Sequence, residues 1–178
     1  MEHEDDSKLV ELLRQGNEDA FTILHERYRK KLCVFIRRHT DDYVHAEDIA
    51  QKAFLKVFQS IESLRDGGKF KSWLYTIAYR IAVDDARKKH EIPIDDSLVE
   101  QKCNDSIQID IAIANEERAS IWSVAQNVLT PDEFAAIWLR YAEDEKVESI
   151  ATIMKRSNSS VRVLLFRARK KLLVAIEN

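Results

Sequence analysis

Two stretches of the chain have residue types suited to binding nucleic acid. Residues 157–172, SNSSVRVLLFRARKKL, contain five Arg or Lys, no acid and recurring apolar residues. Residues 70–89, FKSWLYTIAYRIAVDDARKK, combine four aromatic rings with five cations. Cations neutralise phosphates and rings stack on unpaired bases, so each stretch is a candidate DNA contact. For the first stretch, the alternative is a final amphipathic helix with a solvated basic face.

The distribution of charge along the chain distinguishes these two stretches from the rest of the sequence, whereas the net charge does not. The 178 residues carry a net charge of only −3. Residues 69–89 contain six cations and two acids, and residues 155–171 contain seven cations and no acid. Between them, residues 91–118 contain eight acids and two cations. The pattern predicts two polyanion-binding surfaces joined by an acidic connector, which is either a solvated spacer or a mimic of nucleic acid.

Other classes of site have little support. Cys33 and Cys103 are far apart, and the five histidines show no ligand spacing, so no metal site or cofactor is expected. Neither a nucleophile–base set nor a phosphate-cradling loop is evident, so the chain is not expected to be an enzyme. No apolar run reaches about 18 residues and the start lacks a signal peptide, so we expect a cytoplasmic protein without membrane insertion.

The elements that position these residues are predicted to be helices, because the chain has only three Gly and two Pro. In the first half, apolar periodicity predicts helices from Ser7, as its cap, to Gly16, from Asn17, from Ala46, and over 70–89. The glycines of SLRDGGK, residues 63–69, indicate a loop before the last of these, free to wrap around a flipped base. Phe58 is placed on the apolar side of the third helix.

The second half is predicted to hold a helix from about Ile109, a helix capped by Thr130, and a helix pair over 147–172. Thr130, Pro131 and Glu133 have the pattern of a capping box. In the pair, a small Ala151 allows a close crossing, and apolar residues can be buried between the helices: Ile150, Met154, Val161 and Leu165. This is the spacing of a helix-turn-helix, whose second helix enters a major groove.

The order of these pieces resembles one family. LTPDEFAAIWLRYAEDEKVESIATIMKRSNSSVRVLLFRARKKL is similar to the promoter-reading C-terminal domain of bacterial sigma factors of the extracytoplasmic-function group. GNEDAFTILHERYRKKL, AEDIAQKAFLKVF and FKSWLYTIAYRIAVDDARKK resemble, in order, parts of that family's N-terminal domain. The resemblance implies an all-α protein of two small helical domains. It places sigma region 2 at residues 7–90, the acidic linker at 91–112 and sigma region 4 at 113–178.

The resemblance assigns the third helix to docking on a clamp helix of core RNA polymerase. The matching residues are Glu47, Asp48, Gln51 and Phe54. Asp48, Gln51 and Phe54 are three residues apart, so they can share one helix face as a polar rim around an aromatic anchor. A core position for Phe54 remains the alternative.

By the same resemblance, the loop and fourth helix melt the promoter and read its −10 element. Phe70 and Trp73 are assigned to the core, whereas Tyr75 and Tyr79 are expected to face the strand. Arg80 stands where the family often has Asn, which puts the −10 base preference in question. The predicted −10 residues are Arg65, Lys69, Lys71, Tyr75, Tyr79, Arg80, Arg87 and Lys88.

The last helix is expected to read the −35 element. Two departures from the family stand out: Lys155 replaces a Gly in the turn, and Val163-Leu164 replaces Ser-Arg. A left-handed Lys costs about 1 kcal/mol, so a differently built turn is expected. The predicted −35 residues are Arg156, Ser159, Ser160, Arg162, Val163, Arg167, Arg169 and Lys170, with Lys171 as a further phosphate contact.

The family implies core RNA polymerase, promoter DNA and an anti-sigma factor as partners. Two alternatives stay open: a helix-turn-helix regulator that acts without polymerase, and an interaction protein of sigma-like fold that has lost promoter reading. The aromatic and basic first half disfavours the regulator. Val163 and Leu164 motivate the interaction protein.

Overall fold

The computed structural model describes residues 5–91 and 116–177, and over these ranges the regular elements are all helices. The acidic linker, Cys103 and the predicted helix start near Ile109 lie outside the described residues. The α-helices are α1 (Asp6–Arg14), α2 (Glu18–Ile36), α3 (Tyr43–Ser60), α4 (Phe70–Glu91), α5 (Glu116–Val128), α6 (Pro131–Tyr141), α7 (Val147–Met154) and α8 (Asn158–Glu177). Three short 3-10 turns are η1 (Arg37–His39), η2 (Ile61–Ser63) and η3 (Gly67–Lys69).

Side-chain caps explain where several helices begin. Asn17 accepts from the Ala20 amide to start α2, and Asp42 accepts from His45 to start α3, three residues earlier than expected. Thr130 and Glu133 form the predicted capping box of α6. The prediction for Ser7 was wrong, because Asp5 occupies the N-cap position and Ser7 lies inside α1.

Both halves of the chain contribute apolar side chains to one continuous core. In the first half, α1 to α4 bury aliphatic and aromatic side chains that include Leu24, Phe35 and Phe70. In the second half, Trp138 stacks near Phe134 at 6.1 Å and meets Trp122 edge-on at 4.9 Å. The expected two-part helical fold is therefore confirmed.

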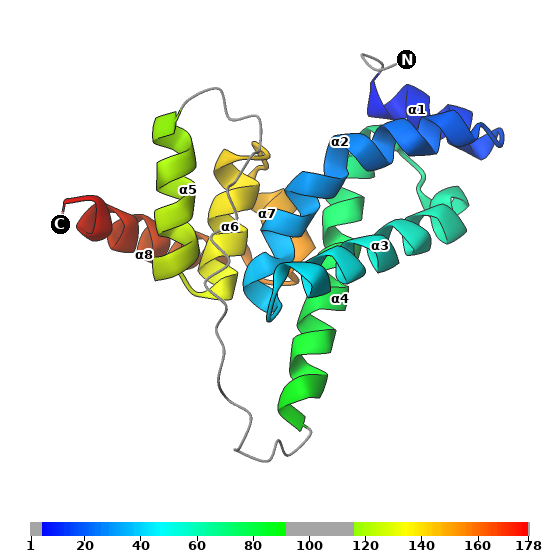
Figure 1. Cartoon of the computed structure of the whole chain (residues 1–178). Coiled ribbons are helices and arrows are strands. Elements are labelled where there is room, and N and C mark those ends of the chain that lie inside the picture. Colours follow the sequence, from blue (N-terminus) through cyan, green and yellow to red (C-terminus); the bar gives the residue numbers. More distant parts are fainter. Residues whose placement is uncertain (1–4, 92–115, 178) are drawn as a thin grey trace.

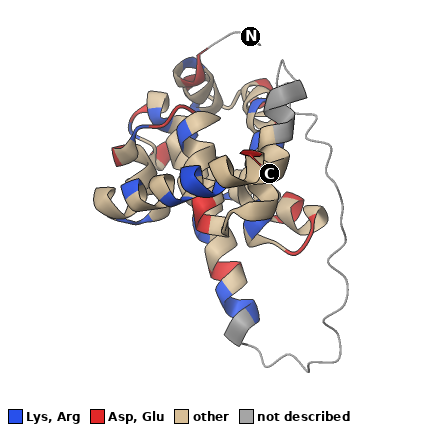
Figure 2. Ribbon diagram, turned by 90° about the vertical axis from the view of Figure 1, so that its left-hand side faces the viewer, with Lys and Arg blue, Asp and Glu red and all other residues tan. Residues whose placement is uncertain are grey.

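The two halves pack side by side (Figure 1), with α4 against α7 and with α2 and η1 against α6. The end of α4 extends past the rest of the described molecule and carries Lys and Arg (Figure 2). The face between the halves is therefore removed from solvent, while the far faces of α3, α4 and α8 remain accessible.

Candidate nucleic-acid interface

The α7–α8 pair has helix-turn-helix geometry. Lys155 ends α7 in the left-handed conformation, with φ 52° and ψ 48°. The Ser157 hydroxyl accepts from the Ser160 amide at 3.1 Å and so caps the start of α8. As predicted, Ile150, Val161 and Leu165 are buried between the helices. The turn is therefore built in the usual left-handed way, and the expectation of a different turn was wrong.

Contacts around Lys155 stabilise its left-handed backbone conformation. The Lys155 and Arg156 amides donate back to α7 carbonyls, at 3.3 Å to Thr152 and 2.9 Å to Ala151. Met154, just before the turn, is buried. Together, these contacts stabilise a backbone conformation that a non-glycine residue rarely adopts.

Most of the predicted −35 residues lie on the outer side of α8. Arg162 is exposed and has no ion-pair partner among the residues described, and Val163 is 47% exposed. Leu164 is partly buried against the core. Among the remaining cations, Lys171 forms an ion pair with Glu133, with 2.7 Å between Lys171 Nζ and Glu133 Oε2. The residues exposed beside Arg162 and Val163 are Ser159, Arg167, Arg169 and Lys170, with Ser160 half-buried.

The predicted −10 residues divide into two groups. Tyr75 is fully buried and Tyr79 is 6% exposed, so the expectation that they face an open surface is wrong in this arrangement. Lys71 is half-buried in the same contact region. The exposed group comprises Arg65, Lys69, Arg80, Arg87 and Lys88.

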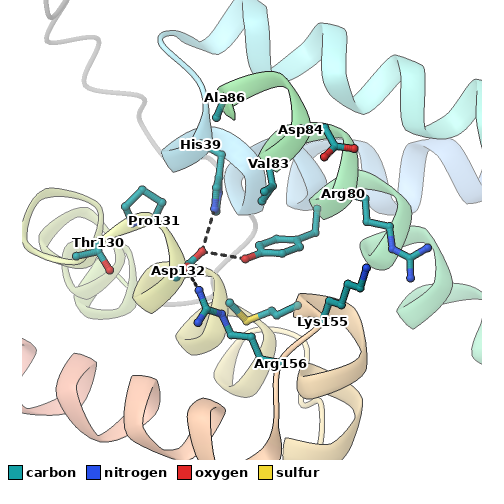
Figure 3. A pocket seen from close by; sticks show the side chains of 12 residues that line it. His39, Arg80, Val83, Asp84, Ala86, Thr130, Pro131, Asp132, Lys155 and Arg156 are labelled. Atoms are coloured by element: carbon teal, nitrogen blue, oxygen red, sulfur yellow. Dashed lines mark hydrogen bonds and ion pairs between the residues drawn. The ribbon is translucent and has the colours of Figure 1, made fainter. Parts of the chain in front are cut away.

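Asp132, near the start of α6, is the centre of the contact between the halves (Figure 3). Its carboxylate accepts from the Tyr79 hydroxyl at 2.8 Å, lies 3.4 Å from His39 Nε2, and pairs with Arg156. The His39 hydrogen bond is the largest cause that lowers the pKa of Asp132, to about 2; burial acts in the opposite direction, and Tyr79 adds to the lowering. One carboxylate therefore engages a predicted −10 residue and a predicted −35 residue together.

A second set of contacts joins α4 and η1 to the segments on either side of α6. Lys71 Nζ donates to the Glu143 carbonyl at 2.5 Å and lies 3.3 Å from a Glu145 carboxylate oxygen. Arg38 donates to the Leu129 carbonyl at 2.6 Å. These bonds use cations of the first half, so they compete with the binding of phosphates.

The same contact region buries several polar atoms, among them the Tyr75 hydroxyl, Glu143 Oε1 and His39 Nδ1. The Tyr75 hydroxyl interacts with the Glu143 carboxyl there. Burial raises the pKa of Glu143, although Lys31 lies 3.8 Å away, and burial also raises the pKa of Tyr75.

The glycine-rich loop before α4 is held closely against α1. A Cβ on Gly67 would lie 3.0 Å from the Ser7 Cα, and Arg14 donates to the Leu64 carbonyl. Asp66 accepts from the Gly68 amide at 3.0 Å. Gly67 thus serves a close backbone approach, rather than the freedom to wrap around a base that the sequence suggested.

Two of the four predicted docking residues on α3, Gln51 and Phe54, line an apolar hollow. Asp48 and Gln51 are exposed, Phe54 is 3% exposed and contacts His25, and Glu47 pairs with Arg29 at 3.1 Å. The hollow has a volume of about 470 Å³ and is lined by Glu18, Phe21, Thr22, His25, Gln51, Phe54, Leu55 and Phe58.

Two lining residues of this hollow were missed as surface residues by the sequence analysis. Phe58 was placed with the core but is 50% exposed, and Leu55 is 57% exposed. The signal available was the four-residue step from Phe54 to Phe58 and from Gln51 to Leu55, which puts all four beside one another on the helix. Half-exposed apolar side chains beside polar ones are typical of a docking surface.

Neither metal nor membrane chemistry is indicated in the described part of the chain. Over residues 5–91 and 116–177, no cluster of three or more His, Cys, Asp or Glu has metal-site geometry. Among the same residues, no helix is both long and apolar enough to cross a bilayer.

Comparison with known proteins matches the two halves of the chain to two family domains. The sigma-70 region 2 family matches residues 24–91, and the sigma-70 region 4 family matches residues 125–172. The RNA polymerase sigma-H factor of Pseudomonas aeruginosa is 30% identical over 98% of this chain and 95% of its own length. The chain belongs to the extracytoplasmic-function sigma factors. The sigma-E factor of that group from Haemophilus influenzae is 31% identical over 93% of this chain and 92% of its own.

Solved structures show the same fold for sigma factors. The sigma factor RpoE of Bartonella quintana, in complex with the anti-sigma factor NepR, has a TM-score of 0.70 at 22% identity, covering 88% of this chain and 96% of that one. CnrH in complex with the cytosolic domain of CnrY has a TM-score of 0.66 at 18% identity over 98% of both chains. Sigma factors are DNA-binding initiation factors, which accounts for two cationic surfaces on one helical chain.

Proposed function

We propose that this sigma factor binds core RNA polymerase through α3 and reads its promoter with two separate surfaces. Region 2, residues 7–90, would melt and read the −10 element, and region 4, residues 113–178, would read the −35 element. The relative that is 30% identical over 98% of the chain carries this proposal. The exposed Arg162, in the first turns of the second helix of the helix-turn-helix, supports its −35 part.

Polymerase docking would use the hollow on α3. Gln51 supplies a polar group to its lining, while Leu55 and Phe58 supply exposed apolar surface over the buried Phe54. Aromatic anchors in such hollows contribute most of the binding free energy in many interfaces. A helix of the polymerase core is the proposed occupant.

Promoter binding would require the two halves to separate. Tyr75 and Tyr79 are buried, and the Tyr79 hydroxyl donates to Asp132 across the contact between the halves. The first half could then offer Tyr75, Tyr79 and Lys71 to an opened strand. We propose that core polymerase favours the separated form, and that an anti-sigma factor of the kind bound to RpoE favours an inactive one.

The protein would act in the cytoplasm, as a non-catalytic subunit. A second candidate is an interaction protein of the same fold that lacks promoter reading, since Val163 is 47% exposed on the reading side of α8. A transcription assay with added core polymerase separates the two candidates.

Docking is tested by measuring the affinity of the chain for purified core polymerase. Phe58→Ala should weaken this affinity by about tenfold or more, because it truncates a central apolar anchor. Tyr141→Ala is the matched control, since Tyr141 is 56% exposed on α6 and lies outside the hollow. Equal affinities for Phe58→Ala and the unaltered chain would refute docking through α3.

A further inference from the structure

A pocket lies in the contact between the two halves and is lined by residues of both (Figure 3). Its volume of about 750 Å³ is within the range for small-molecule sites. The first half contributes His39 of η1 and part of α4 to the lining. The second half contributes the start of α6 and the turn after α7. We call this space the inter-half pocket, and it exists only while the halves are in contact.

The two acids that line the inter-half pocket are paired with cations. Asp132 accepts from the Tyr79 hydroxyl and forms an ion pair with Arg156. Asp84 forms an ion pair with Arg87 on the same helix, with 3.6 Å between a carboxylate oxygen and a guanidinium nitrogen. These carboxylates therefore do not balance the positive charge that remains in the lining.

That remaining charge belongs to two cations, one from each half. Arg80 on α4 and Lys155 after α7 are both exposed, and neither side chain forms an ion pair or hydrogen bond with the residues described. Figure 3 shows both on the side of the pocket away from Thr130 and Pro131. Two like charges that face one space repel each other, and an anion bound between them would remove that repulsion.

The amount of unpaired charge favours a phosphate monoester as this anion. A phosphate monoester carries a charge of about −1.5 to −2 at neutral pH, which matches two cations, whereas a carboxylate would leave one of them unbalanced. A guanidinium can bind two phosphate oxygens at once, and an ammonium binds phosphate as a point charge. Val83 and Pro131 supply apolar surface in the same lining, against which the organic part of the ligand can pack.

We propose that the inter-half pocket binds a small phosphate monoester, such as a nucleotide, whose phosphate joins Arg80 to Lys155. Because one cation comes from each half, the ligand binds only the arrangement in which the halves are in contact. It therefore opposes the separation on which binding to polymerase and promoter depends. This inhibitory effect rests on the proposed sigma-factor function, whereas the binding itself does not.

Binding is tested by isothermal titration calorimetry with the full chain free of polymerase. The probes are AMP and glycerol phosphate, and the matched controls without phosphate are adenosine and glycerol. At least one phosphorylated probe should bind, and Arg80→Gln and Lys155→Gln should each weaken that binding by about tenfold, because each removes a charged contact to the phosphate. Lys30→Gln removes an exposed cation of α2 outside the pocket and should leave the affinity unchanged.

Three outcomes of the calorimetry would overturn the inference. The first is that neither phosphorylated probe binds, and the second is that the controls bind as tightly as the probes. The third is that Arg80→Gln and Lys155→Gln keep the affinity of the unaltered chain. Binding of inorganic phosphate without binding of either monoester would indicate an adventitious ion only.

A second measurement tests whether the ligand holds the halves together. The affinity of the full chain for core polymerase is measured with and without the probe that binds. At about ten times the Kd of the probe, this affinity should fall by about tenfold, because the ligand lowers the fraction of separated chains by that factor. For Lys155→Gln, which binds the probe about tenfold more weakly, the affinity should fall by only about twofold.

The same comparison separates this inference from the proposed function. Equal losses of core affinity in the two chains would show that the probe acts on polymerase, and would overturn the inhibitory effect. If the unaltered chain does not bind core polymerase even without the probe, the proposed sigma-factor function fails, while the calorimetry still decides whether the pocket binds phosphate monoesters.

Discussion

Replacing Asp132 with Asn should weaken the contact between the halves and so raise the DNA affinity of the free chain. The pKa of Asp132 falls from 3.8 to about 2 in the folded protein, which corresponds to about 2 kcal/mol in favour of the charged form. The side chain is 31% exposed, so solvent screening reduces the ionic part to about 1 kcal/mol. The hydrogen bonds from His39 and Tyr79 of the first half are already part of this shift, and Arg156 lies in the same half as Asp132, so the contact loses about 1–2 kcal/mol in total.

This free energy predicts a measurable shift. A change of about 1–2 kcal/mol raises the fraction of separated chains between about 5- and 30-fold while that fraction is small. Apparent affinity scales with the binding-competent fraction, so binding to a single-stranded −10 fragment, which needs the covered Tyr75 and Tyr79, should tighten by the same factor. The assay is fluorescence anisotropy with the chain free of polymerase.

A control isolates the contact from the change in charge. Glu148→Gln also removes one negative charge from the second half, from an exposed position on α7. It should tighten DNA binding only slightly, through weaker long-range repulsion. Equal affinities for Asp132→Asn and Glu148→Gln would show that Asp132 does not hold the halves together.

Four further results are expected. Gly67→Ala should lower the free energy of unfolding by about 1–2 kcal/mol in urea titration, because its Cβ would press on the Ser7 backbone; no change would contradict that contact. Lys155→Gly should raise the melting temperature by about 1–4 °C, because glycine adopts the left-handed conformation without strain. A decrease in melting temperature would contradict the presence of strain at Lys155. Arg162→Ala should weaken promoter binding by the holoenzyme with core affinity kept, and equal promoter affinity would contradict our placement of α8. Since burial raises the pKa of Glu143 above 4.5, the stability that Glu143 contributes is present below pH 4.5 and is lost as pH rises through the raised pKa. Glu143→Gln should therefore flatten the plot of melting temperature against pH in this range. An unchanged plot would exclude Glu143 as the source of the pH dependence.

Local features were predictable because their causes are local. The capping box at Thr130 needs only residues three apart, and the burial of Val161 and Leu165 follows from helical periodicity within one pair of helices. The left-handed Lys155 was not predicted, because its propensity opposes that conformation and the packing around Met154 overrides it.

The burial of Tyr75 and Tyr79 lay beyond sequence reasoning for a different reason. A spacing of four shows that the two rings share a face of α4, but not what covers that face. Their cover comes from α6, whose Asp132 is 53 residues from Tyr79 in the chain. Gly67 is a parallel case, since composition marks a turn there but cannot show that the Ser7 backbone lies against it.

The most direct test of the account is to map transcript starts made by core polymerase and this chain on genomic DNA. We expect a set of starts that core polymerase alone does not make, sharing one sequence motif near −10 and another near −35. Arg162→Ala should weaken use of those starts most where the −35 motif is strongest. Starts identical to those of core polymerase alone would contradict a promoter-reading sigma factor and favour the interaction protein.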